Sequence, residues 1–357
     1  MIDVAAITSG RSVPSRRFRV AQHVPALAGH GIRVRELVPR IEKYAPPPLA
    51  DHAWAAPVVT SRVAKAAWAV PKLATRIPGV AATWSADLTW LQREMVPGFV
   101  TLEIVTKRPW VFDVDDAVWL GRAGAPAAIA RLARGADVVM AGNEYLASWC
   151  EAQGATVRIV PTAVDTDRYR ATTRVPADDR PLVIGWMGTS ANFRYLERIA
   201  SPLSSFLRSS PAELFVVADR RPQLPGIPPE RLRWQRWSAE TEVEAIQAMD
   251  IGLMPLGTDE WSEGKCALKM LQYLACEVPA LVSPTGMTEA ILGGGDLGPS
   301  LRTAADWLAA LEELRDDDAL RRRRGEQGRR VVLGRFSRTT VAAEIASVFD
   351  EVIHGRR

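Results

Sequence analysis

Short apolar runs alternate with longer amphipathic segments along the whole chain. In the first half, the apolar runs predict strands near residues 3–8, 33–37, 88–91, 111–114, 138–141 and 157–160. Helical spacing of apolar positions appears near residues 16–29, 60–75, 125–134 and 144–153. The stretch 39–57 is rich in proline and predicts an irregular surface loop. Strands that alternate with helices are typical of α/β domains with parallel sheets.

A second series of the same kind follows a polar stretch, residues 166–181, which predicts a linker. Its strands are expected near residues 182–186, 213–218, 231–237, 252–255 and 280–283, and its helices near 195–209, 240–249 and 265–276. From Ala304 onward the chain predicts charged helices. We therefore predict an α/β protein with two Rossmann-like, doubly wound domains facing a cleft. The domains cover residues 1–165 and 182–337, and a last helix lies within residues 338–357.

Length, composition and charge narrow the class of protein. A chain of 357 residues suits two domains, and no apolar run approaches the ~18 residues of a membrane-spanning helix. The first residues read as a strand and not as a signal peptide. Three cysteines cannot all pair, which favours a reduced, cytoplasmic protein.

The charge is unevenly spread along the chain. Residues 1–174 contain 22 Lys and Arg against 15 Asp and Glu, a net charge of +7, whereas the remainder carries −3. A basic first half suits an anionic acceptor, or peripheral association with the anionic inner face of a membrane. Nucleic acid would also suit the charge, but the sequence has no zinc spacing and no aromatic RNA-binding strand, so we predict no nucleic-acid partner.

The stretch from Trp261 to Leu292 carries the most chemistry. Lys265 and Lys269 lie four residues apart, and we expect them to share one face at the start of a helix over residues 265–276. A helix N-terminus with added lysines is a ready anion site, and a diphosphate is the anion we predict. Exposed lysines on a solvated helix would give the same pattern.

The same stretch resembles the nucleotide-sugar site of glycosyltransferase family 4, the retaining enzymes of GT-B fold. Residues 271–279, LQYLACEVP, follow that family's L-E-A-M-A-C-G-x-P pattern, and residues 285–291, TGMTEAI, follow its G-G-x-x-E-I pattern. Gln272 stands where the family has a ribose-binding Glu, and an amide can still bond a ribose hydroxyl. The Gly-Lys-x-x-x-Lys start resembles a variant branch that lacks the usual Glu-x7-Glu. The resemblance implies a nucleotide-sugar donor, Glu289 near the donor sugar or its phosphates, and neither metal nor cofactor. It also implies that the last helix, within residues 338–357, crosses back to the first domain.

A strand-to-helix turn in the first domain is strongly basic. Gly10 permits a tight turn, and Arg11, Arg16, Arg17 and Arg19 follow it. Doubly wound folds bind ligands at such strand ends, and guanidinium groups hold phosphates well. We interpret these residues as the acceptor-binding site of residues 1–165, although a basic surface patch would look the same.

Three carboxylates close the fourth predicted strand, at Asp113, Asp115 and Asp116. Clustered carboxylates suit a divalent metal, and they also serve to organise loops. The family resemblance implies instead that Asp115 replaces the donor-contacting His of a Val-His-Asp motif and that Asp116 matches its Asp. In that alignment Asp115 would hydrogen-bond a sugar hydroxyl or stabilise developing positive charge at the anomeric carbon.

A second glycine-punctuated turn, residues 184–194, begins the second domain. Its backbone N–H groups are expected to face an anion. The family's G-R-x-x-x-x-K pattern matches Gly188 and places Arg194 at the Lys position, whereas Thr189 replaces the Arg. We expect Lys265 and Lys269 to supply the missing charge.

These features predict a glycosyltransferase, retaining and metal-independent, that uses a nucleotide diphosphate sugar. Its acceptor would be a glycan, as in polysaccharide biosynthesis, a lipid-linked sugar or a small molecule. A sugar-nucleotide epimerase of GT-B fold and a non-catalytic nucleotide-sugar-binding relative fit the same residues and stay open as alternatives.

Overall fold

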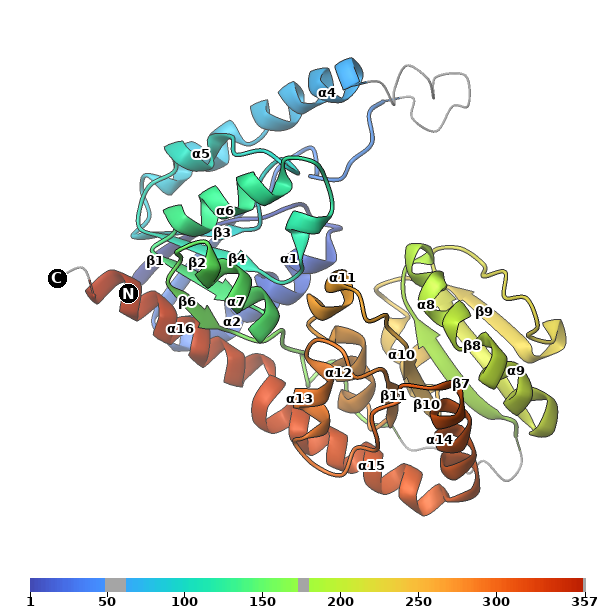
Figure 1. Cartoon of the computed structure of the whole chain (residues 1–357). Coiled ribbons are helices and arrows are strands. Elements are labelled where there is room, and N and C mark those ends of the chain that lie inside the picture. Colours follow the sequence, from blue (N-terminus) through green and yellow to red (C-terminus); the bar gives the residue numbers. More distant parts are fainter. Residues whose placement is uncertain (49–61, 173–179, 356–357) are drawn as a thin grey trace. The chain divides into compact units, whose positions relative to one another are not determined.

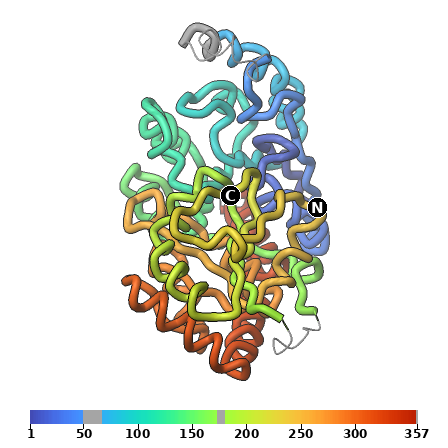
Figure 2. Tube along the Cα trace, turned by 90° about the vertical axis from the view of Figure 1, so that its right-hand side faces the viewer, coloured from blue at the N-terminus to red at the C-terminus, as the bar shows by residue number. Residues whose placement is uncertain are grey.

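Two compact units make up the structure, a computed structural model that describes residues 1–48, 62–172 and 180–355. Unit 1 comprises Met1–Thr162 and Val341–Arg357, and unit 2 comprises Ala163–Thr340. Each unit contains a parallel sheet with interleaved helices (Figure 1). Figure 2 traces the chain from a second side. The predicted α/β class with two Rossmann-like units is confirmed.

The sheet of unit 1 has the strand order β2-β1-β3-β4-β5-β6, and each neighbouring pair is parallel. Its strands are β1 (Ile2–Ile7), β2 (Ile32–Leu37), β3 (Leu88–Gln92), β4 (Trp110–Val114), β5 (Val138–Ala141) and β6 (Val157–Ile159). β3, β4 and β5 are buried along their whole length. Burial on both faces explains why these strands read as continuous apolar runs in the sequence.

Helices connect the strands of unit 1. They are α1 (Pro14–Arg19), α2 (Val24–Gly29), α4 (Arg62–Ala74), α5 (Ile77–Thr83), α6 (Ala125–Gly135), α7 (Glu144–Ala152) and α16 (Arg338–His354), with 3₁₀ turns η1 (Ala21–His23), η3 (Leu102–Val105) and η4 (Val118–Leu120). The continuous helix expected over residues 16–29 is wrong. Pro25 lacks an N–H, so the chain breaks there into α1, η1 and α2. Part of the expected loop 39–57, and the start of the expected helix 60–75, lie outside the described residues.

A buried ion pair joins α1 to β4 in the interior of unit 1. Arg19 is 2% exposed, and its Nε and Nη2 donate to the two carboxylate oxygens of Asp113 at 2.9 and 3.3 Å. The same guanidinium donates to the carbonyl oxygen of Val160 at 2.8 Å. Nearby, the rings of Trp90 and Phe349 meet edge to face at 5.3 Å, which packs α16 against β3.

The sheet of unit 2 has the order β11-β10-β7-β8-β9 and is also parallel. Its strands are β7 (Leu182–Met187), β8 (Ala212–Ala218), β9 (Leu232–Arg236), β10 (Ile251–Met254) and β11 (Ala280–Val282). A core of apolar side chains from β7, β8, α9 and α14 fills the space between this sheet and its helices.

The helices of unit 2 differ in two places from those predicted. They are α8 (Phe193–Arg198), α9 (Ala200–Ser209), α10 (Glu242–Gln247), α11 (Glu260–Glu263), α12 (Leu268–Ala275), α13 (Thr288–Leu292), α14 (Ala304–Asp316) and α15 (Asp318–Val331), and a π-helix covers Val332–Phe336. Pro202 cannot donate to the carbonyl of Arg198, so the expected helix 195–209 divides into α8 and α9.

The expected helix 265–276 begins three residues late, at Leu268. Ala267 has a left-handed backbone with φ 52°, and the amide of Met287 donates to the carbonyl of Lys265 at 3.4 Å. Gly286 packs against this turn so closely that an added Cβ would lie 2.8 Å from the carbonyl oxygens of Glu263 and Lys265. The turn is thus bonded to the loop after β11 and cannot wind into the helix.

The stretch predicted as a linker packs in part within unit 2. Tyr169 is 1% exposed. Val164 and Asp165 lie just before the predicted linker, at the end of the predicted first domain, and they belong to unit 2, where Val164 forms a parallel bridge with Ser337. Arg338 pairs with Asp165 and Asp167 at 2.8 Å each. Residues 173–179 lie outside the described part of the chain.

The first prediction concerns the buried Arg19–Asp113 pair. Arg19→Met should lower the free energy of unfolding by about 3–5 kcal/mol at neutral pH, because it leaves a buried carboxylate unpaired. Burial already raises the pKa of Asp113 despite Arg19. In Arg19→Met the pKa of Asp113 in the folded protein rises further above the pKa of Asp113 in the unfolded chain. The variant therefore loses stability as the pH rises from the unfolded pKa to the folded pKa. The loss should therefore shrink from pH 7 toward pH 5.

Denaturant unfolding at several pH values measures this effect. Arg16→Gln serves as the control, because the Arg16–Glu36 pair is 21% exposed on both sides and should contribute less than about 1 kcal/mol. Equal losses from the two variants would refute a special role for the buried pair.

Candidate functional site

Both sheets contain a point at which the strand order reverses. In unit 2 the chain passes from β7 to β8 and β9 on one side, and then to β10 and β11 on the other. In unit 1 it passes from β1 to β2 and then back across β1 to β3. Loops that leave neighbouring strands in opposite directions open a crevice at the carboxyl ends of the strands, where doubly wound sheets bind ligands. These two switch points are the candidate sites, and each is described within its own unit.

Arg194 lies at the switch point of unit 2, on the helix that follows β7. Its Nη2 donates to the hydroxyl of Tyr195 at 2.8 Å, and its guanidinium lies 4.7 Å from the ring of Tyr195. The same hydroxyl accepts from Ser262 on α11 at 3.3 Å. Tyr195 is buried while Arg194 is exposed, so a fixed phenol positions a guanidinium at the surface.

Lys265 follows α11 in the chain. Its Nζ is 4.3 Å from the centre of the Trp261 ring, a cation–π contact. Because α12 begins at Leu268, the prediction that Lys265 and Lys269 share the first turn of one helix is wrong. The Nζ of Lys269 instead donates to Oε1 of Gln272 at 3.3 Å. Arg194 and Lys265 are thus brought to α11 from the loops after β7 and β10.

The turn after β7 uses its own backbone donors. The amide of Gly188 donates to the carbonyl of Val217 at 3.1 Å, and the amide of Ser190 donates to Asp219 at 2.6 Å. Thr189 is exposed, and its hydroxyl accepts from Asn192 at 3.1 Å. The expectation that these N–H groups face an anion finds no support, and contacts of Gly188 and Thr189 with a donor stay predictions.

Gln272 belongs to a buried hydrogen-bonded cluster. Its side chain is fully buried, and Nε2 donates to the hydroxyl of Tyr169 at 2.6 Å. That hydroxyl in turn donates to Oε1 of Glu242 at 2.5 Å. A glutamate in place of Gln272 could not donate to Tyr169, which is a local reason for the amide. The ribose contact of Gln272 remains a prediction that the geometry does not favour.

Glu289 lies on α13, after β11. Its carboxylate is 55% exposed and pairs with Arg302, itself 64% exposed, at 2.8 Å. An exposed pair of this kind contributes little to stability. The donor-side role of Glu289 stays a prediction.

Arg93 organises the carboxylates after β4 in unit 1. Its Nε donates to Asp115 at 2.5 Å, and its Nη2 lies 3.7 Å from Asp116. Burial raises the pKa of Asp115, but the guanidinium of Arg93 outweighs burial and holds that pKa below its ordinary value. Asp115 is therefore an ionised carboxylate at neutral pH. Asp113 faces Arg19, and the described residues include no group of three or more His, Cys, Asp or Glu side chains arranged to bind a metal.

The predicted acceptor arginines do not act as one cluster. Arg19 is buried against Asp113, Arg16 pairs with Glu36, and the guanidinium of Arg17 lies 4.8 Å from the ring of Phe18. Arg11 is exposed. Gly10 is buried with φ 148°, and an added Cβ would lie 2.7 Å from Glu42. Phosphate binding by these arginines stays a prediction, and Arg19 is the least suited because its donors are engaged inside the protein.

A second set of residues at the switch point of unit 1 was not predicted. Five polar side chains that are at most 4% exposed lie near the ends of β1 and β3: Thr8, Lys43, Arg76, Gln92 and Glu94. Connections among them include an ion pair from Lys43 to Glu94 at 2.8 Å and a bond from Arg76 Nη1 to the carbonyl of Thr8 at 3.2 Å. Burial lowers the pKa of Arg76 to about 10.

Several atoms of this buried polar cluster have no hydrogen-bond partner among the described residues. They are Thr8 Oγ1, Gln92 Nε2, Glu94 Oε2, and Arg76 Nε and Nη2. An unpaired buried polar atom costs roughly 1–3 kcal/mol. Donors and acceptors are both present, so a ligand rich in hydroxyl groups would match them. The signal that sequence reasoning missed is the run Gln92–Glu94, which directly follows a predicted strand; Lys43 and Arg76 give no local signal.

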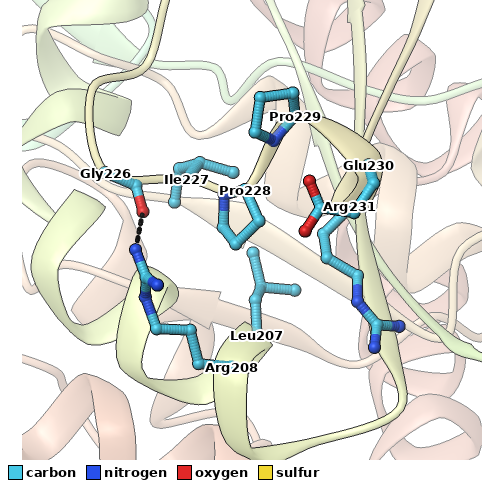
Figure 3. Close-up of a pocket in the computed structure, with 8 residues that line it drawn as sticks. All are labelled: Leu207, Arg208, Gly226, Ile227, Pro228, Pro229, Glu230 and Arg231. Atoms are coloured by element: carbon cyan, nitrogen blue, oxygen red, sulfur yellow. Dashed lines mark hydrogen bonds between the residues drawn. The ribbon is translucent and has the colours of Figure 1, made fainter.

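A separate hollow lies at the opposite edge of the unit 2 sheet. It has a volume of about 550 Å³ and precedes β9, at the amino ends of the strands (Figure 3). Its lining consists of Leu207, Arg208, Gly226, Ile227, Pro228, Pro229, Glu230 and Arg231. Arg208 donates to the carbonyl of Gly226 at 3.3 Å, as the dashed line shows. None of the predicted site residues lines this hollow.

Comparisons with known proteins identify the fold. No protein-family model matches the sequence, and no curated protein matches it. The structure is similar to sucrose-phosphate synthase from Thermosynechococcus elongatus, with a TM-score of 0.74 and 14% identity over 99% of this chain and 100% of that one. Anabaena HepE in complex with UDP-glucose gives a TM-score of 0.68 and 12% identity over 98% and 100%. WaaG, a glycosyltransferase involved in lipopolysaccharide biosynthesis, gives a TM-score of 0.65 and 12% identity over 97% and 99%.

These solved structures are GT-B glycosyltransferases, and they resemble this chain over nearly its whole length. At sequence identities of 14% and below, this structural similarity establishes a shared fold. The chain therefore has the GT-B fold.

The buried polar cluster yields a stability test. Thr8→Val should raise the free energy of unfolding by about 1 kcal/mol, because it removes a buried hydroxyl without a partner. Thr89→Val is the matched control: Thr89 is fully buried, but its hydroxyl donates to the carbonyl of Lys107 at 2.6 Å. That variant should lose about 1 kcal/mol. A loss at Thr8 in denaturant unfolding would mean that its hydroxyl is already bonded in solution.

A glutamate at position 272 should be harmful. Gln272→Glu should lower the free energy of unfolding by about 1–3 kcal/mol, because a buried carboxylate would face the oxygen of Tyr169 beside Glu242. Gln247→Glu is the control, because Gln247 donates to the exposed carbonyl of Arg170 at 2.8 Å and should change stability by less than about 1 kcal/mol. A Gln272→Glu protein of unchanged stability would contradict this account of the cluster.

Proposed function

We propose that this protein is a glycosyltransferase that moves a sugar from a nucleotide diphosphate sugar to an acceptor. One observation carries the proposal: Arg194 and Lys265 converge on α11 at the switch point of unit 2, within a GT-B fold. HepE, which shares that fold, was solved with UDP-glucose. A diphosphate needs cationic partners, and this switch point supplies two from different loops.

Arg194 and Lys265 would hold the diphosphate and stabilise the charge that develops on the leaving group. Arg194 offers a planar fork of donors, and Lys265 offers a compact charge. Fixed cations can stabilise the charge on the leaving group, as a bound metal ion does in metal-dependent enzymes, and this agrees with metal-independent transfer. Lys269 and Gln272 support the site as positioning residues, since their side chains bond to each other at 3.3 Å.

Asp115 would act on the sugar as an ionised carboxylate. Its lowered pKa makes it unsuited to donate a proton at neutral pH, but suited to stabilise positive charge at the anomeric carbon. Asp116 lies beside it and shares Arg93. Retention of anomeric configuration agrees with the family resemblance of residues 271–291 and is part of the proposal.

The acceptor would bind at the switch point of unit 1. The unpaired atoms of Thr8, Gln92, Glu94 and Arg76 include both donors and acceptors, as the hydroxyl groups of a sugar do. A glycan, a lipid-linked sugar and a small glycoside all present such hydroxyl groups.

Nucleotide binding tests the donor site. In a panel of UDP, GDP, dTDP, ADP and CMP, one nucleoside diphosphate should raise the melting temperature, with or without Mg²⁺. At a hundredfold excess over Kd the stabilisation is about 2.7 kcal/mol. Arg194→Ala and Lys265→Ala should each weaken binding roughly 10- to 100-fold, because a charge-assisted hydrogen bond contributes about 1.5–3 kcal/mol.

Arg208→Ala is the matched control, because Arg208 lies at the opposite edge of the same sheet and should leave the affinity unchanged. Equal weakening by all three variants would refute the assigned site, and no shift with any nucleotide would refute the donor proposal. Incubation with the matching nucleotide sugar then separates the alternatives. Transfer or slow hydrolysis supports a transferase, conversion of the free sugar nucleotide indicates an epimerase, and binding alone indicates a non-catalytic relative.

A further inference from the structure

Unit 1 exposes three large apolar side chains close together. Trp84, Ile104 and Val105 are 65%, 54% and 49% exposed. Trp84 and Val105 are in contact, because the indole N–H of Trp84 donates to the carbonyl of Val105 at 3.1 Å. Single exposed apolar residues are ordinary on protein surfaces, but adjacent ones mark an interaction site.

A basic groove adjoins these side chains. It has a volume of about 360 Å³ and is lined by Val100, Ile104, Arg108, Trp110, Arg131, Leu132, Arg134 and Gly135. Arg131 and Arg134 are exposed on α6, three residues apart and hence on one face. Arg108 lies 4.1 Å above the ring of Trp110 and 3.6 Å from Asp137.

Trp110, one of the residues that line the groove, has a buried donor without a partner. Trp110 is 3% exposed, and its Nε1 has no hydrogen-bond partner among the described residues. This indole N–H and the three guanidinium groups all favour an anion with oxygen acceptors, such as a phosphate. Ile104 belongs to both the groove and the apolar group, so the two are continuous.

The position of this face separates it from the sites already described. Trp110 is the first residue of β4, and Gly135 precedes β5, so the groove lies at the amino edge of the unit 1 sheet. The switch point of unit 1 lies at the carboxyl edge. A ligand in the groove therefore does not occupy the acceptor site.

We propose that this face of unit 1, formed by Trp84, Ile104, Val105, Arg108, Arg131 and Arg134, docks on the surface of an anionic lipid bilayer. Exposed aromatic and branched side chains enter the interfacial region, and arginines bind lipid phosphates. A protein partner would suit the apolar side chains, but the three arginines and the unpaired indole N–H favour a phosphate-bearing surface. The inference does not depend on the proposed transferase activity. Among the described residues, no helix has the length and apolarity to cross a bilayer.

The test uses the full-length chain and vesicles. Flotation with vesicles of phosphatidylcholine mixed with phosphatidylglycerol should recover the protein, and vesicles of phosphatidylcholine alone should recover far less. Arg131→Gln with Arg134→Gln should weaken partitioning about 30-fold, since each basic residue near an anionic surface contributes roughly fivefold. Trp84→Ser should weaken it at least several-fold, and it should reduce the quenching of tryptophan fluorescence by brominated lipids.

Arg220→Gln with Arg221→Gln is the matched control, because it removes two charges from exposed positions in unit 2. If both double variants weaken partitioning equally, only net charge matters and the proposed face is refuted. Equal recovery by neutral and anionic vesicles would also refute it. Inorganic phosphate or glycerol phosphate in the assay separates the sources of the anion: release of the protein by millimolar amounts would identify a soluble phosphate site and overturn membrane docking.

Discussion

The parallel direction of every strand is the constraint on which both candidate sites depend. It places all carboxyl ends of a sheet at one edge, and the reversal of strand order gives each unit one switch point at that edge. Arg194 and Lys265, far apart in sequence, both have contacts that lead to α11, because β7 and β10 are neighbours in the sheet. The chemistry of each unit therefore follows from strand order before any individual residue is considered.

The two switch points are built in different ways. In unit 2, aromatic side chains contact the exposed Arg194 and the half-buried Lys265: Tyr195 contacts Arg194, and Trp261 contacts Lys265. In unit 1, the polar groups are buried, and some of them lack partners. The arrangement in unit 2 leaves charges accessible, whereas the arrangement in unit 1 keeps polar atoms away from solvent and thereby lowers stability. Protein folding alone gives no reason to accept that cost, which is why the buried cluster points to a ligand.

The fold could be predicted from the sequence because strands buried on both faces produce apolar runs, which can be recognised without knowledge of the structure. The prediction placed the strands within a residue or two and failed where proline interrupts a helical pattern, at Pro25 and Pro202. It also failed at Lys265, because the turn there is fixed by contacts with Gly286, twenty-one residues farther along the chain. Lys43 and Arg76 belong to the unit 1 cluster because of tertiary contacts alone, and the local sequence around them does not predict this.

The hydrogen bond from Trp84 to the carbonyl of Val105 has an entropic consequence. An exposed tryptophan ordinarily samples several rotamers and loses that freedom when it is buried against another surface. Here the indole is tethered through its N–H while its ring stays 65% exposed. Folding has thus already removed much of the rotational freedom that binding would otherwise remove. The ring is preorganised, so any apolar surface that covers it gains the hydrophobic contact with a smaller entropic penalty.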